Sequence, residues 1–155
     1  MRRSVGVAIA AFVCLSLASA TAAIAGSPQS SATGAGTDTV GRKFEVSAHN
    51  GPQGAQGQMK YQRAPGDTVH ADVTCLDVGV DPSGTNIAAV VGTITNSNDS
   101  LNPVGGTLRF LLKDTGNANG NPPDEFNADK TPDCTAGSGA TGASVSGNVT
   151  IQLGS

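Results

Sequence analysis

The chain has 155 residues, a length that predicts a single domain. Acidic residues outnumber basic ones by twelve to nine, and no Lys/Arg cluster follows Arg42 and Lys43. Such a chain cannot neutralise a run of phosphates, so we exclude nucleic acid as a partner.

The first 25 residues predict export. Residues 1–3 are a short basic start, an uncharged apolar run follows over residues 5–17, and small residues end at 23–25. This order is typical of a secretory signal peptide cleaved after Ala25, with Ala20 as the alternative. The mature chain would then have seven basic and twelve acidic residues, a net charge of −5. We expect it to be secreted to the extracellular space, without membrane insertion after processing.

The next segment, residues 26–41, predicts a flexible linker. It reads GSPQSSATGAGTDTVG and consists mostly of Gly, Ser, Thr and Ala, which offer little apolar surface to bury. We therefore place the single β-domain at residues 42–155.

From Phe44 onward the hydrophobic period is two, which predicts strands. A change of face near Cys75 indicates a bulge, and the apolar run over 87–94 indicates a strand covered on both faces. The pattern predicts an all-β fold, a small antiparallel sandwich or barrel of six to eight strands. The predicted strands cover residues 44–48, 58–62, 69–78, 87–94, 108–112 and 145–153, with a short segment near 126.

Two cysteines remain after the predicted cleavage, because Cys14 lies in the signal peptide. Cys75 and Cys134 form an even pair in an exported chain, which favours a disulfide over a metal site or a nucleophilic pair. Closing a loop of this length would stabilise the fold by about 4 kcal/mol on the chain-entropy estimate.

Residues 113–126 read KDTGNANGNPPDEF and raise the question of a calcium site. An EF-hand spacing fails, since Thr115 and Phe126 fall at the first and twelfth positions, where ligands are required. We expect a rigid polar turn and no cofactor. Calcium is the alternative, and its candidate ligands are Asp114, Asn117, Asn119 and Asp124.

The sequence predicts no catalytic site. His49 and His70 lie on polar faces of predicted strands, and no GxSxG motif supplies a nucleophile. The chain also has no Trp and one Tyr, so aromatic platforms for stacking sugars are not expected.

The order of several short motifs resembles a family of small exported bacterial β-domains known as hypothetical secreted proteins. These motifs are GAQGQMKYQ, NIAAVVGTIT and TLRFLLKDTG followed by PPDEF, and the resemblance covers residues 44–126. The family is similar to modules that follow copper-oxidase-associated segments in larger secreted proteins. The turn NANGNPP is longer here than in the family. The resemblance implies export and a β fold, and it implies no activity.

We therefore expect a secreted non-enzymatic β-domain, a binding or cell-envelope-associated module of unknown ligand. Two alternatives stay open: a small extracellular hydrolase with an unrecognised site, and a calcium-stabilised adhesion-type module. A cleft that gathers His, Asp and Ser side chains would favour the hydrolase. The ligand, the partner and the oligomeric state do not follow from the sequence.

Overall fold

The chain folds into a closed antiparallel barrel in which the eight strands follow one another in sequence order. The computed structural model describes residues 29–116, 121–137 and 142–154, and the predicted signal peptide lies outside them. The strands are β1 (Ser31–Asp38), β2 (Lys43–Gly51), β3 (Gly54–Gln62), β4 (Val69–Val80), β5 (Asn86–Ser97), β6 (Thr107–Asp114), β7 (Glu125–Asp129) and β8 (Ala143–Gln152). The predicted all-β fold is confirmed, and of the two predicted architectures the structure has the barrel.

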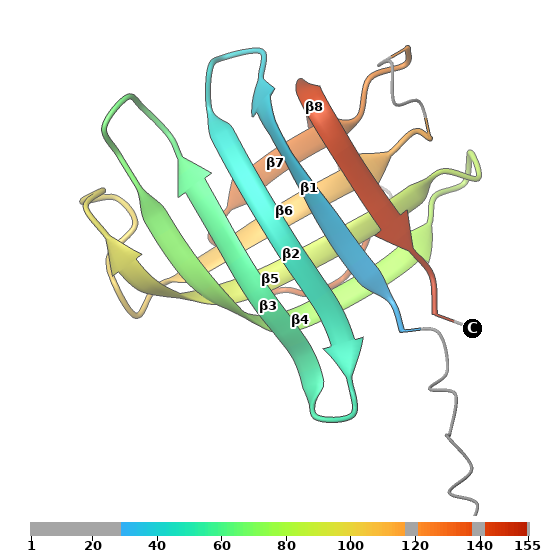
Figure 1. Cartoon of the computed structure of the whole chain (residues 1–155), viewed down its shortest axis with the longest axis horizontal. Helices are drawn as coiled ribbons and strands as arrows, with labels where there is room; N and C mark the ends of the chain where they lie inside the picture. Colours follow the sequence, from blue (N-terminus) through green and yellow to red (C-terminus); the bar gives the residue numbers. More distant parts are fainter. Residues whose placement is uncertain (1–28, 117–120, 138–141, 155) are drawn as a thin grey trace, which may run out of the picture.

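The barrel has two broad sides, which Figure 1 shows one behind the other. Strands β8, β1, β2 and β3 lie side by side in front, and β4 to β7 cross behind them. Within the described part of the chain, no helix is long and apolar enough to cross a bilayer.

Side chains fill the interior, because every second residue of the strands points inward. Phe44 and Phe126 stack with ring centroids 4.0 Å apart, and Phe110 meets Phe126 edge-on at 5.0 Å. Tyr61 meets Phe110 edge-on at 6.0 Å. These four aromatic residues, which are all those of the described chain, are buried, and aliphatic side chains from the surrounding strands pack against them. The scarce aromatic residues thus gather in one packed core.

The predicted flexible linker is wrong over Ser31–Asp38, which form β1. This strand pairs with β2 on one side and with β8 on the other, and so closes the barrel. Its glycines serve packing: a Cβ on Gly36 would lie 2.2 Å from Cγ1 of Val145, and a Cβ on Gly34 would lie 2.7 Å from a β8 carbonyl oxygen. The predicted domain boundary at residue 42 is wrong for the same reason.

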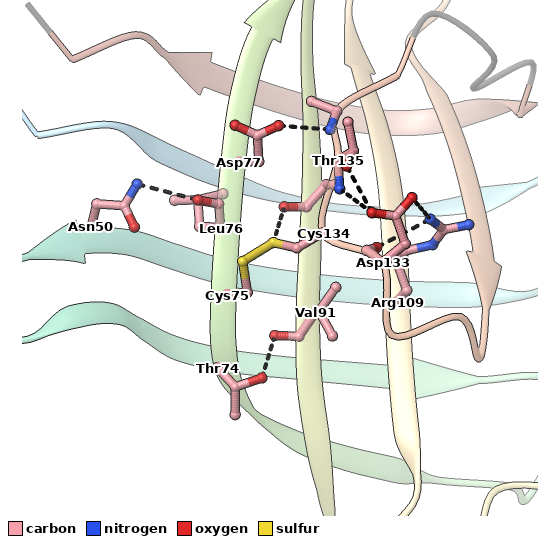
Figure 2. The surroundings of a disulfide bond; sticks show 12 residues. Asn50, Thr74, Cys75, Leu76, Asp77, Val91, Arg109, Asp133, Cys134 and Thr135 are labelled. Atoms are coloured by element: carbon pink, nitrogen blue, oxygen red, sulfur yellow. Dashed lines mark hydrogen bonds and ion pairs between the residues drawn. A yellow bond between two sulfur atoms is a disulfide. The ribbon is translucent and has the colours of Figure 1, made fainter.

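Two predicted details of the β4–β5 pair are confirmed. The register of β4 shifts between Val73 and Cys75, where the sequence pattern changes face. Strand β5 is buried on both sides, because Ala88 and Val90 point into the core while Ala89 and Val91 are buried on the outside. Residues 130–137, called the strap below, run outside β4, β5 and β6 in Figure 2 and reach the carbonyl of Ala89.

Candidate functional site

The strap is fixed by the predicted disulfide, which the structure confirms. The bond joins Cys75 of β4 to Cys134 with a sulfur–sulfur distance of 2.01 Å (Figure 2). Next to it, the backbone N–H of Ala136 donates to Oδ2 of Asp77 at 2.8 Å. A disulfide is consistent with an oxidising compartment, as expected outside the cell.

Arg109 of β6 holds the other end of the strap. Its guanidinium donates to both carboxylate oxygens of Asp129, at 2.9 and 2.6 Å, and to the carbonyl of Asp133 at 3.1 Å. Burial opposes ionisation of Asp129, but the bonds from Arg109 and from Thr131 outweigh it, and the pKa of Asp129 is lowered. The charges on this side of the barrel therefore hold the strap in place.

The two described residues of the calcium candidate set, Asp114 and Asp124, both bind the backbone of β8. Oδ2 of Asp124 accepts from the N–H of Val149 at 2.8 Å, and Oδ2 of Asp114 accepts from the N–H of Ile151 at 2.9 Å. The second oxygen of Asp124 accepts from the backbone and the hydroxyl of Thr115. These bonds matter because only two residue pairs join β7 to β8, against eight between β1 and β8.

The other two candidates, Asn117 and Asn119, lie outside the described residues. Among the described residues, no three His, Cys, Asp or Glu side chains come together as metal ligands. Through their hydrogen bonds, Asp114 and Asp124 join β8 to the end of β6 and the start of β7.

Two further carboxylates organise loops. Asp99 accepts from Arg63 at 3.1 Å and from Asn102 at 2.8 Å, and these bonds, led by Arg63, lower its pKa to about 2. Asp81 accepts from the hydroxyl of Ser83 and from backbone N–H groups, and it pairs with Lys113 at 3.0 Å. The pKa of Asp81 is therefore well below its usual range.

A groove of about 600 Å³ lies on the outside of β8, β1, β2 and β3. Small residues let the backbone form part of its lining: Ala35 and Gly36 of β1 and Gly147 of β8. At Gly147 a Cβ would lie 2.2 Å from the carbonyl oxygen of Ala35, so only glycine fits there. The longer lining side chains belong to β2 and β3, namely Lys43, Glu45, Lys60 and Gln62.

The sheet register explains how these side chains meet. Glu45 of β2 lies opposite Ala35 of β1 on one side and opposite Lys60 of β3 on the other. Lys43 is opposite Gln62 in the next outward-facing row, and Thr37 is opposite Lys43. The groove thus combines two ammonium groups, one carboxylate, one amide and several hydroxyls.

Lys43 and Lys60 differ from the other basic side chains of the described chain. Arg42, Arg63, Arg109 and Lys113 each pair with an aspartate. Lys130 donates to a backbone carbonyl, that of Leu101. For Lys43 and Lys60, both exposed, no carboxylate of the described residues lies within ion-pair distance.

The two histidines lie on the same outer side as the groove. His49 of β2 and His70 of β4 are both exposed and both face a residue of β3, Gln56 and Lys60 respectively. His70 also lines a smaller hollow of about 330 Å³ that shares Glu45 and Lys60 with the groove. The structure places them on strands separated by β3, as parts of a polar sheet surface.

Sequence reasoning missed the groove although it assigned the outward positions of β2 and β3 correctly. The groove also needs β1 and β8, and β1 lies inside the predicted linker. In β1, outward residues such as Thr33 and Thr37 alternate with alanine and glycine, a signal too weak to distinguish a strand from a linker.

Comparison of the chain with protein-family models, with curated proteins and with solved structures finds no match. Conclusions about its role therefore rest on the geometry described above.

Proposed function

We propose that this protein is an exported binding module without catalytic activity, and that the groove over β8, β1, β2 and β3 is its ligand site. The observation that carries the proposal is the division of charged side chains between two sides of the barrel. Those around the strap, in the loops and between β8 and the strands β6 and β7 bond within the protein. Those of the groove lie exposed around a hollow whose volume is in the range of small-ligand sites.

Export is supported by the disulfide and by the N-terminal sequence pattern. The resemblance of residues 44–126 to small exported bacterial β-domains supports export as well. A calcium-stabilised module has less support, because the carboxylates of Asp114 and Asp124 already accept hydrogen bonds from the backbone.

The proposal is tested by sedimenting the mature protein, residues 26–155, with the envelope fraction of the cells that export it. We expect the wild-type protein to sediment with this fraction and Ala35→Gln, which places a longer side chain in the groove, to stay in the supernatant. Thr93→Gln is the matched control, because Thr93 is an exposed residue of β5 outside the groove. Equal sedimentation of the two variants, or none of the wild type, would contradict the proposal.

A further inference from the structure

The groove has a charge that differs from that of the rest of the molecule. Its lining has two lysines and one glutamate, whereas the predicted mature chain has a net charge of −5. Lys43 and Lys60 are diagonal neighbours on adjacent strands, a relation that places side chains roughly 7–8 Å apart at their bases. Like charges this close repel each other, and Glu45 offsets only one of them. An anion between the two ammonium groups would remove the repulsion.

The residues that line the groove also limit the kinds of contact that such an anion can make. The four aromatic core residues include the single tyrosine, Tyr61, which is buried inside the barrel. A neutral sugar that depends on stacking has no aromatic platform among the described residues. The lining offers charge and hydrogen bonds instead, from the ammonium groups, the Gln62 amide and the hydroxyls of Thr37, Thr68 and Ser146.

The strands themselves exclude one common way of binding a peptide. In a closed barrel every strand has a neighbour on each side, so an extended peptide finds no free edge on β1, β2 or β3 to pair with. A ligand rich in hydroxyl groups that also has carboxylates matches the ammonium, amide and hydroxyl groups of the lining and needs no free strand edge.

We propose that the groove binds an acidic polysaccharide, with Lys43 and Lys60 holding its carboxylates and the neighbouring amide and hydroxyl groups binding its hydroxyls. This inference rests on the proposed function and adds the ligand class. Glu45 sets the position of the bound carboxylates, since it leaves Lys43 as the cation farther from a fixed negative charge.

The test is calorimetric titration of the mature protein with polygalacturonate at low salt. We expect binding that weakens as salt rises, because the lysines are exposed and screened by ions. Lys43→Gln together with Lys60→Gln should weaken binding by about tenfold or more, since bonds to charged groups are among the stronger ones. Lys130→Gln removes the same charge outside the groove and should leave binding unchanged.

Two further ligands make the test specific. Fully methyl-esterified polygalacturonate has the same backbone without carboxylates, and equal binding of this ester would overturn the inference. Poly-L-glutamate has carboxylates on a peptide, and equal or tighter binding of it would overturn the polysaccharide assignment. If polygalacturonate fails to bind while the envelope fraction still distinguishes Ala35→Gln from Thr93→Gln, the ligand class is wrong and the binding module stands.

Discussion

The two outer sides of this barrel use their polar residues in opposite ways. Outside β4, β5 and β6, the strap covers an apolar strand, and Arg109, Asp77 and Asp129 bond to one another or to the strap. Outside β8, β1, β2 and β3, most outward residues are polar, and Lys43 and Lys60 are exposed to solvent. The difference teaches which side stabilises the fold and which side is available to a ligand.

The physical reason lies in the neighbours of each charge. A carboxylate or guanidinium that loses water on folding needs partners within the protein, because burial of an unpaired charge is costly. On the covered side the strap removes water from the charged side chains, which therefore pair within the protein. The open side stays hydrated, so an unpaired charge there lowers the stability of the fold very little. Charged residues on this side can therefore be selected for binding.

The largest effect expected on the covered side comes from removing the disulfide. The double variant Cys75→Ala, Cys134→Ala should lower the free energy of unfolding by about 4 kcal/mol, because the bond closes a loop spanning 59 residues. Urea denaturation followed by circular dichroism measures this value. A loss below about 1 kcal/mol would mean that Arg109 and Asp77 hold the strap without the disulfide.

The next largest effect on stability is expected where β8 joins β6 and β7. Asp124→Ala leaves the N–H groups of Val149 and Thr115 without their carboxylate, and should cost about 3 kcal/mol because these groups lie in a largely buried region. Asp72→Ala is the control, since Asp72 is exposed on the outside of β4, and should cost less than about 0.5 kcal/mol. Equal costs for the two variants would refute the role of Asp124 in closing the barrel.

The stability of the fold should fall in acid, because the carboxylates that organise the loops become protonated. Because the pKa of Asp99 is lowered to about 2 and that of Asp81 is also lowered, their contribution to stability is present above about pH 4. It is lost as the pH falls from about 4 towards 2, where the folded protein must also take up these protons. The melting temperature should drop over this interval.

The matched variant for this experiment is Asp99→Asn, which removes one of the carboxylates whose pKa is lowered. It should lower the melting temperature at pH 6 and make the fall between pH 4 and pH 2 shallower than in the wild type. A fall as steep as that of the wild type would show that Asp99 does not contribute to it.

The smallest effect on stability is expected on the open side. Lys43→Gln and Lys60→Gln should change the free energy of unfolding by less than about 0.5 kcal/mol each, since both residues are exposed and unpaired within the described chain. Urea denaturation of each variant tests this. A loss of 2 kcal/mol or more would mean that these lysines stabilise the barrel, and their loss of ligand binding could not be ascribed to the groove.

Alternation with a period of two predicted most of the strands, because each strand of a small barrel has one face in the core and the other towards solvent. A change of face in this alternation predicted the bulge at Cys75, and the continuous apolar run over 87–94 predicted the double burial of β5. The presence of two cysteines after the predicted signal peptide was sufficient to predict the bond between Cys75 and Cys134. The strands and the bulge follow from short segments of sequence, and the disulfide depends on a choice between very few cysteines.

The tertiary structure alone decided the rest. Strand β1 has too few apolar residues to be recognised, since its inward glycines make room for Val145, Val149 and Phe44 of neighbouring strands. The hydrogen bonds of Asp114 and Asp124 to backbone N–H groups of β8 could not be predicted either, because β8 is distant in sequence. The groove arises from the register of β8, β1, β2 and β3, and register is a property of paired strands that no single segment encodes.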